Sequence, residues 1–247
     1  MSDPQPLALL HDDRDVVAVA KPSGEPVIAA RREPPEACLQ KRLERELGCR
    51  LFVVHRIDRD ASGVVVFAKN ADAHRALSLA FEHRQVAKAY AAFVAGAIEP
   101  PRGRLDLALH SARRGKTRPA RPGEPGAQPA VTDYDTRERW ALGTATVSLL
   151  EACPLTGRHH QIRVHLRSAG APILFDPLYA RGLVPEALAQ APCARLALHA
   201  SRIELPMPGG DGRLSVEAPL APDLAALEAW LGSTAGPVDR EQRGVLA

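Results

Sequence analysis

Strand-like and helix-like hydrophobic patterns succeed one another along the chain. Apolar residues alternate with polar ones, or form short β-branched runs, in segments of the length expected for strands. These segments are 7–12, 16–21, 51–54, 64–68, 88–98, 131–139, 144–151, 196–205 and 214–217. A charged turn around Asp13 and Arg14 separates the first two.

Other segments repeat apolar residues every three or four positions, which predicts helices. In 34–47 the leucines recur every fourth residue from Leu39, and Gly48 is a natural C-terminal stop. Asn70 is the expected N-cap of a second helix, which ends near a histidine and an arginine that suit the negative end of the helix dipole. Further helices are predicted over 156–170 and 222–231.

The helix predicted over 156–170 has two unlike faces. The residues expected to turn inward are Ile162, Leu166 and Ala169. The opposite face carries His159, Arg163 and Arg167 at four-residue spacing. The sequence therefore predicts an amphipathic helix with a basic face.

Strands in runs with few helices favour an α+β fold, because the regular strand and helix alternation of a parallel sheet is missing. We expect a mixed, mainly antiparallel sheet with flanking helices and a central catalytic cleft. There is no internal repeat, and no Gly/Pro linker separates two autonomous halves. Residues 1–231 are therefore predicted to form one domain, and residues 232–247 a disordered tail.

Composition places the chain among ordinary globular proteins, with 45% hydrophobic and 25% charged residues. The cysteines show no metal-ligand spacing and no disulfide framework. No stretch approaches 18 apolar residues, and the N-terminus lacks the pattern of a signal peptide. We therefore expect a cytoplasmic protein with reduced thiols and no membrane segment.

The net charge of +3 is unevenly distributed. Between residues 102 and 121 a single acid, Asp106, stands among seven basic residues: Arg102, Arg104, Arg113, Arg114, Lys116, Arg118 and Arg121. The glycines and prolines of this region predict a mobile loop excursion over about 102–129. A solvated basic loop and a surface for a polyanion are both compatible with this pattern.

The stretch HRIDRDASGVVVFAK, at 55–69, sets two acids and two arginines against a buried strand. Asp58 and Asp60 are candidates for general acid and base, or for ion pairs with the arginines. A protein kinase catalytic loop is excluded, because the downstream asparagine, the DFG motif and the glycine-rich phosphate loop are absent.

Four ordered segments resemble one known family. HRIDRDASGVVVFAKN is similar to the HRLD-x-x-TSG signature of the RluA-type pseudouridine synthases, which turn uridine into pseudouridine within RNA. LLHDDRDVVAVAKPSGEPV, VAKAYAAFVAG and LTGRHHQIRVHLRSAGAPILFDPLY resemble three further family segments, in the family's order. The small N-terminal RNA-binding module of many relatives is expected to be absent.

The resemblance implies that Asp58 is the catalytic aspartate. It would act on a uridine so that the base detaches from the ribose, rotates and rejoins through carbon; attack on the sugar, attack on the ring and removal of a ribose proton all stay open. An ionised acid in a cleft poor in water needs a neighbouring cation, and Arg163 is our candidate. Tyr90 and Ile162 would flank the base. Arg56 would fill the space that the base vacates or hold the displaced strand, and an ion pair with Asp60 is its alternative.

Further RNA contacts follow with less support from the motifs. Lys88, Arg158 and His160 are candidates for phosphate or sugar contacts, together with Arg113, Arg114, Lys116 and Arg118 of the basic excursion. The sequence departs from the family at Ala61, His159 and Phe175, where relatives usually carry threonine, a small polar residue and glycine.

We therefore expect an RNA pseudouridine synthase, a monomer acting on an rRNA or tRNA stem-loop without a cofactor or metal. An inactive RNA-binding protein of the same fold, and a hydrolase that releases uracil, are the alternatives.

Overall fold

The computed structural model describes residues 7–29, 33–112 and 115–237. Its contacts divide the chain into two compact units. The first comprises Met1–Tyr90, Cys153–Thr156 and Leu198–Ala221, and the second comprises Ala91–Ala152, Gly157–Ala197 and Pro222–Ala247. Each unit is described by itself.

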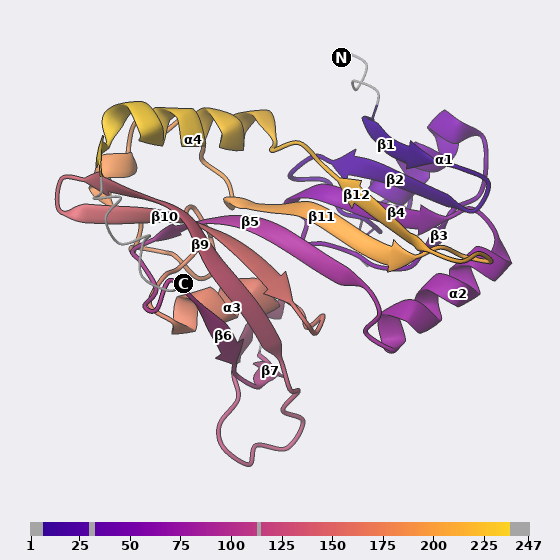
Figure 1. Cartoon of the computed structure of the whole chain (residues 1–247), viewed down its shortest axis with the longest axis horizontal. Helices are drawn as coiled ribbons and strands as arrows, with labels where there is room; N and C mark the ends of the chain where they lie inside the picture. Colours follow the sequence, from indigo (N-terminus) through magenta and orange to yellow (C-terminus); the bar gives the residue numbers. More distant parts are fainter. Residues whose placement is uncertain (1–6, 30–32, 113–114, 238–247) are drawn as a thin grey trace. The chain divides into compact units, whose positions relative to one another are not determined.

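The first unit is built on strands that lie side by side in the order β1, β2, β4, β11 and β12 (Figure 1). Their bounds are Leu9–Asp12, Val16–Lys21, Ser62–Ala68, Leu198–Pro206 and Arg213–Glu217, and the short β3 (Phe52–Val53) also pairs with β4. β4 and β11 are parallel, and the other pairs described in this unit are antiparallel. These strands follow the segments that the hydrophobic pattern predicts.

The core of the first unit lies between one sheet face and α2 (Ala71–Glu82). Val64 and Val66 on β4 and Ile203 on β11 pack against Ala73 and other small or apolar residues of the helix. The neighbouring β4 residues point to the other face and are also fully buried. β4 is thus a central strand buried on both faces, as its run of valines predicts.

Two helix termini of the first unit form as the sequence predicts. The side chain of Asn70 caps α2 by accepting a hydrogen bond from the Ala73 backbone at 2.9 Å. Gly48 ends α1 (Leu39–Leu47) in the left-handed conformation, with φ of 67°. α1 begins five residues later than the predicted start at residue 34, because residues 34–37 form turns.

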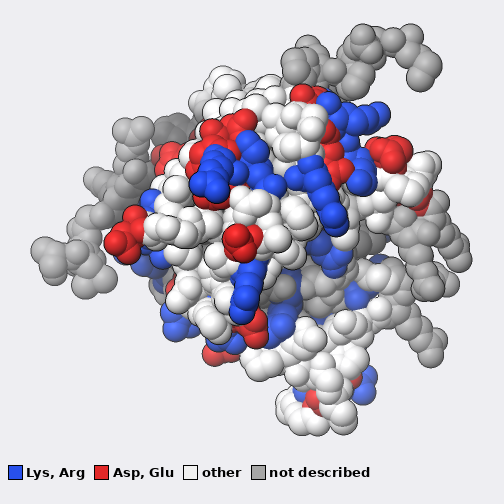
Figure 2. All heavy atoms as spheres, turned by 90° about the vertical axis from the view of Figure 1, so that its right-hand side faces the viewer, with Lys and Arg blue, Asp and Glu red and all other residues white. Residues whose placement is uncertain are grey.

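Charged side chains of both signs are interspersed on the face shown in Figure 2, which views the molecule from the side of α1 and α2. In the first unit, Arg42 of α1 pairs at 3.2 Å with both Glu25 and Glu46. Neither sign covers a broad continuous area of this face. Exposed pairs of this kind contribute little to stability.

The strands of the second unit centre on β9 (Val131–Leu142) and its hairpin partner β10 (Ala145–Pro154). β6 (Arg102–Asp106) and β13 (Gly236–Pro237) pair antiparallel with β9. β7 (Leu109–Ser111) and β8 (Thr117–Pro119) form a separate hairpin. β5 (Ala87–Ala95) runs along the chain from the first unit into the second.

The expectation of a loop over 102–129 is wrong for part of that region, since β6, β7 and β8 lie within it. Arg102 and Arg104 of β6 pair with Asp135 and Asp133, the residues directly opposite them on β9. Cross-strand pairs of opposite charge explain why a basic segment forms a strand here. They also reduce the positive charge that the sequence suggested for this region.

The helices of the second unit differ from prediction at their ends. α3 spans Gln161–Ser168 and begins five residues later than predicted, after His160 in the left-handed conformation. α4 spans Pro222–Thr234, and β13 follows it, so the expected disorder from residue 232 is wrong as far as residue 237. Residues 238–247 of that predicted tail lie outside the described residues. A short 3-10 helix, η2, covers Glu186–Leu188.

The fold is α+β, with mixed and mainly antiparallel strand pairing and helices packed on the strands, which confirms the predicted class. Over the described residues, no helix is both long enough and apolar enough to cross a membrane.

Candidate active site

The loop that carries Asp58 leads into β4 and is held in a tight turn. The Ala61 backbone donates a hydrogen bond to the Asp58 carbonyl at 3.2 Å. Ile57 before the acid is buried, Asp58 is half-buried and Arg56 is exposed. The acid therefore stands on a short turn with an apolar anchor on one side and the buried strand β4 on the other.

Lys21 holds this loop in place through hydrogen bonds to backbone carbonyls. The side chain is 1% exposed, and its ammonium donates hydrogen bonds to the carbonyls of Pro22, Glu25 and Arg59 at 2.7, 2.7 and 2.8 Å. Three carbonyl oxygens match the three donors of an ammonium group, which offsets the cost of burying it. Because Arg59 directly follows Asp58, these bonds tie the acid-bearing turn to the end of β2.

Two further hydrogen bonds join the loop at 22–26 to the same turn. The Ser23 hydroxyl donates to the Asp60 carbonyl at 2.6 Å, and the Gly24 backbone donates to the Arg59 carbonyl at 2.9 Å. Backbone carbonyls on both residues that follow Asp58 are thus occupied. The KPSGEP segment acts as a brace for the acid.

The exit of the turn is fixed by β11. At Gly63, where φ is 114°, a Cβ atom would lie only 2.2 Å from the Ala200 carbonyl oxygen. The adjacent Ser62 shares a buried hydrogen bond of 2.9 Å with Nδ1 of His199. Because Nε2 of His199 lies against the Ala218 carbonyl, that nitrogen carries the proton and Nδ1 accepts from the serine hydroxyl.

Tyr90 on β5 lies within the electrostatic reach of Asp58. Burial, and secondly the negative charge of Asp58, raise the pKa of the Tyr90 phenol far above its usual value. Both effects disfavour the phenolate. Tyr90 therefore keeps its hydroxyl proton across the physiological pH range, available as a hydrogen-bond donor.

His55 and Lys88 form a second pair of perturbed groups in the first unit. Burial, and secondly the charge of Lys88, lower the pKa of His55 to about 3, so its ring is neutral. Its Nε2 accepts a hydrogen bond from the Val66 backbone at 3.0 Å, and its ring stacks on Phe81. Burial also lowers the pKa of Lys88. Lys88 and Tyr90 share one face of β5, because they are two residues apart on a strand.

Arg163 lies on α3 and forms a buried ion pair with Asp176. Its Nε and Nη2 contact the two carboxylate oxygens at 2.7 and 2.8 Å, and both side chains are nearly inaccessible. Asp176 also accepts hydrogen bonds from the backbones of Leu178 and Tyr179. Cζ of the Arg163 guanidinium lies over the Tyr179 ring, 5.1 Å from the ring centroid. This two-pronged contact fixes the plane of the guanidinium.

The amphipathic pattern predicted for α3 is therefore wrong at Arg163. All residues from Gln161 to Leu166 are buried, and only Arg167 of the expected basic face is exposed within the helix. Arg163 is tolerated inside because Asp176, 13 residues away, compensates its charge.

Sequence comparison identifies relatives of the chain. Residues 15–168 match the family described as RNA pseudouridylate synthase. The dual-specificity RNA pseudouridine synthase RluA of Escherichia coli (strain K12) is 37% identical over 213 residues, covering 86% of this chain and 93% of that protein. The chain belongs to the RNA pseudouridylate synthase family. The predicted resemblance to the RluA type is confirmed, and the chain is a pseudouridine synthase, an RNA isomerase.

Two further comparisons agree with this assignment. The ribosomal large subunit pseudouridine synthase D of Xanthomonas campestris pv. campestris is 34% identical over 244 residues, covering 90% of this chain and 68% of that protein. The solved structure of human RNA pseudouridylate synthase domain containing 4 shares 26% identity and a TM-score of 0.71, covering 91% of this chain and 93% of that chain.

In this pseudouridine synthase the basic excursion is only partly available to a ligand. Arg118 pairs with Glu124, and that contact and the Arg121 backbone lower the pKa of the Glu124 carboxyl to about 2. Lys116 is exposed on the β7–β8 hairpin. Arg113 and Arg114 lie outside the described residues.

Two other predicted RNA contacts lie at the start of α3. Arg158 is half-buried, and its Nε donates to the Pro129 carbonyl at 3.2 Å, while its backbone donates to the Gln161 side chain. Nδ1 of His160 lies 2.9 Å from the Tyr179 hydroxyl. Ile162, predicted to press on the base, is buried.

Lys21 and Asp176 are the residues that sequence reasoning missed. Both stand in segments that carry the family resemblance, KPSGEP and FDPLY. A charged residue at a turn is ordinarily expected to be exposed, so neither motif signals burial by itself. The turn at Asp176 also contains a left-handed residue, since Phe175 adopts φ of 58°.

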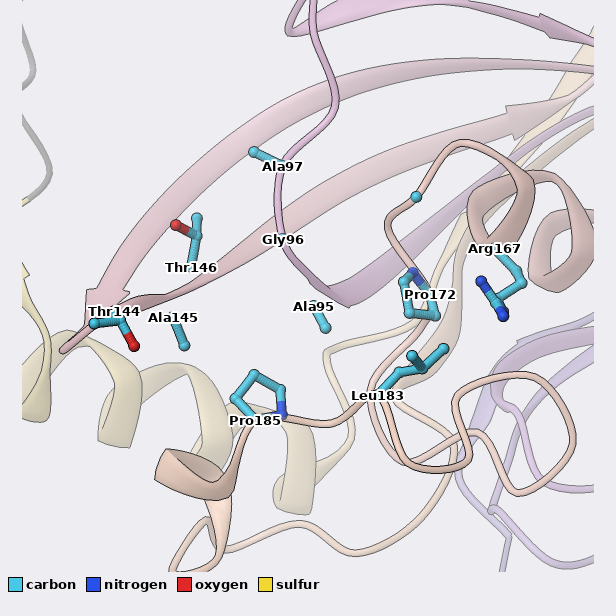
Figure 3. A pocket seen from close by; sticks show the side chains of 11 residues that line it. Ala95, Gly96, Ala97, Thr144, Ala145, Thr146, Arg167, Pro172, Leu183 and Pro185 are labelled. Atoms are coloured by element: carbon cyan, nitrogen blue, oxygen red, sulfur yellow. The ribbon is translucent and has the colours of Figure 1, made fainter.

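The second unit contains a pocket of about 430 Å³, shown in Figure 3. Ala95, Thr146, Pro172 and Leu183 line it, and Arg167 contributes the one charged side chain of its lining. None of the predicted site residues lines this pocket. Within the described ranges, no three His, Cys, Asp or Glu side chains group closely enough to hold a metal ion.

Proposed function

We propose that this pseudouridine synthase isomerises uridines in structured RNA with Asp58 as its catalytic carboxylate. The observation that carries the proposal is the support of the Asp58 turn. Lys21, Ser23 and Gly24 occupy the carbonyls of the two following residues, and β11 confines Gly63. A turn held from both sides keeps the carboxylate in one position, as an acid that must meet a flipped nucleotide requires.

Tyr90 is the partner of Asp58 in this proposal. Its hydroxyl retains its proton beside the negative charge, so it can donate a hydrogen bond during the reaction while its ring stacks on uracil. In the reaction the bond between the ribose and the ring nitrogen breaks, and a bond from the ribose to a ring carbon forms. The ring nitrogen gains a proton and the ring carbon loses one, so no co-reactant is consumed.

Arg163 is the cation that we propose for the reacting centre, with part of its charge compensated by Asp176. Its contacts with Asp176 occupy Nε and Nη2 and hold the guanidinium plane in one orientation. A preorganised cation stabilises the ionised form of an acid without reorganisation during the reaction. We assign Ile162 to the opposite side of the base and the exposed Arg56 to the space that the base vacates.

RNA binding in this proposal rests on cations outside the reacting centre. The candidates are Lys88, Arg158, His160, Lys116 and Arg118, together with Arg113 and Arg114. Exposed ion pairs such as Arg118 with Glu124 are weak, so the arginine can exchange its partner for a phosphate. Phosphate contacts contribute salt-dependent affinity with little sequence selectivity.

The substrate we propose is an rRNA or tRNA stem-loop, because bases in loops are the least costly to extrude. Among the relatives, the Xanthomonas campestris protein is named a ribosomal large subunit synthase and the Escherichia coli protein a dual-specificity RNA enzyme. We further propose that the protein acts in the cytoplasm as a monomer.

The test incubates purified protein with total RNA from a strain lacking the gene and maps pseudouridine by carbodiimide primer extension. Wild type is expected to create at least one new site, and Asp58→Asn none, because the amide cannot serve as the anionic group. Asp60→Asn is the matched control, two residues away, and is expected to retain activity. Product formation by Asp58→Asn at the wild-type rate would refute the catalytic assignment.

The same assay separates the two alternatives. If the protein only binds RNA, the wild-type protein creates no new pseudouridine site. A hydrolase would release free uracil and leave abasic positions, which chromatography of the small-molecule fraction detects. Either outcome would overturn the proposed reaction.

A further inference from the structure

Thr117 of β8 lies at the centre of a polar contact between the β7–β8 hairpin and the start of α3. The residue is buried, with 5% of its surface exposed. Its backbone N–H donates to the Tyr179 hydroxyl at 2.8 Å, and its own hydroxyl lies 3.0 Å from Nδ1 of His159. Both groups of this one residue are therefore held by side chains from outside the hairpin.

His159 and His160 form one unit at this contact. Their rings stack with centroids 3.6 Å apart, and Nδ1 of His160 shares a hydrogen bond of 2.9 Å with the Tyr179 hydroxyl. The backbone of His160 is left-handed, with φ of 53°, which orients the two successive rings before α3 begins. The hairpin thus meets a prearranged pair of imidazoles and a phenol.

An apolar contact lies beside these hydrogen bonds. Leu109 of β7 packs with Ala130 and with Val164 of α3, and Tyr179 packs against the same cluster. The cluster is small, since among the described residues it holds three buried side chains and the partly buried Tyr179. A hairpin of two three-residue strands with so small a base depends on its polar contacts to keep one position.

The inward direction of Thr117 decides where its neighbours point. Successive residues of a strand point to opposite faces, so anchoring Thr117 inward turns Arg118, which follows it on β8, outward. Lys116, which directly precedes the strand, is exposed. The contact of His159 with Thr117 therefore orients the basic side chains of the hairpin.

We propose that His159 is a positioning residue for RNA binding: through Thr117 it holds the β7–β8 hairpin against α3, so that its basic side chains are presented to the RNA before binding. This inference rests on the proposed function only in taking the hairpin as an RNA contact.

The expected effect follows from the population of the docked hairpin. When only a fraction of the molecules has the hairpin docked, the apparent dissociation constant rises by the inverse of that fraction. Loss of one hydrogen bond between neutral groups lowers an equilibrium constant by about 3- to 10-fold. The rise in KM cannot exceed this factor, so His159→Ala is expected to raise KM for the RNA by up to about 10-fold and to leave kcat within about 2-fold.

The experiment compares full-length variants on one substrate RNA. Thr117→Val removes the hydroxyl and keeps the backbone N–H and the strand-favouring branched shape. It therefore removes the hydrogen bond between Thr117 and His159 by changing Thr117. His159→Asn is the conservative variant, because an asparagine amide can occupy the place of Nδ1. His83→Ala, at the exposed end of α2, is the control for loss of an imidazole.

The proposal predicts a specific pattern among these variants. His159→Ala and Thr117→Val each raise KM, the double variant raises it no further than the larger single effect, and His159→Asn restores it to within about 2-fold of wild type. Limited trypsin digestion without RNA cleaves after Lys116 faster in His159→Ala than in wild type. The thermal midpoint moves little, because the substituted residue, His159, is exposed.

Three results would overturn the proposal. One is a KM for His159→Ala equal to that of His83→Ala. A second is an effect on kcat alone, and a third is strict additivity in the double variant. Faster trypsin cleavage with an unchanged KM would show a docked hairpin that does not serve RNA binding, which also contradicts it. Failure of the catalytic assignment is distinguishable, because it appears in Asp58→Asn and leaves the trypsin result untouched.

Discussion

Replacing Gly63 by alanine tests whether the approach of β11 holds the Asp58 turn in place. A Cβ atom on Gly63 would lie 2.2, 2.6 and 2.7 Å from the O, N and C atoms of Ala200. All three belong to the backbone, so no side-chain rotation relieves the clash. The parallel contact of Gly63 with Ala200 must therefore open by about 1 Å to reach ordinary van der Waals separation.

Two costs add at this position. Overpacking against a well-packed core costs about 1–3 kcal/mol. An alanine at φ of 114° adds about 1–3 kcal/mol of backbone strain. The sum, about 2–6 kcal/mol, is a large part of the 5–15 kcal/mol by which such proteins are ordinarily stable. A shift of about 1 Å in the neighbouring turn is also expected to lower kcat by about 100-fold.

Equilibrium urea unfolding and pseudouridine formation measure the two effects, with two glycine controls. Gly212→Ala shares a positive φ, 118°, but meets open space, so it shows the strain without the clash. Gly232→Ala lies in α4 with nothing near it and is expected to stabilise the protein by about 0.5–1 kcal/mol. A free energy of unfolding for Gly63→Ala equal to that of Gly212→Ala, with normal kcat, would refute the reasoning.

Two further substitutions address the brace and the neutral histidine. Lys21→Met removes the donor to the carbonyls of Pro22 and Glu25 and one of the two donors to the Arg59 carbonyl, so it is expected to lower the free energy of unfolding by about 2 kcal/mol or more, measured by urea unfolding. A loss below about 1 kcal/mol would contradict the role of the ammonium. His55 has a pKa of about 3 in the fold against about 6.5 in the unfolded chain, so its contribution is complete above pH 6.5 and declines as the pH falls toward 3. Because part of its surface remains exposed, we expect about 1–2 kcal/mol of stability to be lost between pH 7 and 5. His55→Gln, which keeps an acceptor for the Val66 backbone, is expected to flatten this pH dependence, and an unchanged slope would exclude His55 as its source.

Periodicity in the sequence was sufficient for most elements of the fold, because burial repeats every two residues in a strand and every three or four in a helix. β2, β4 and α2 follow their predicted segments closely. Asn70 and Gly48 mark helix termini, because their hydrogen-bond partners are only three or four residues away along the chain. The boundaries of α1 and α3 were less predictable. At His160 a left-handed residue delays the helix, and nothing in the local pattern signals that conformation.

The family and the chemistry class also came from the sequence, because short motifs place the reactive residues in a fixed order. Asp58 and Tyr90 were identified in this way, and the structure adds that the charge of one raises the pKa of the other. Their proposed roles rest on that resemblance and on the bracing contacts. By contrast, the burial of Arg163 contradicts its helical pattern.

What the sequence by itself determined is the order of the elements, the family and the location of the acid, since each depends on neighbours along the chain. Only the tertiary structure decided which charges are compensated. Asp176 neutralises Arg163 across 13 residues, and carbonyls of two separate loops enclose Lys21. These partners are close in space, and burial makes an unpaired charge costly. The separation of two residues along the chain does not show which of them will form such a pair.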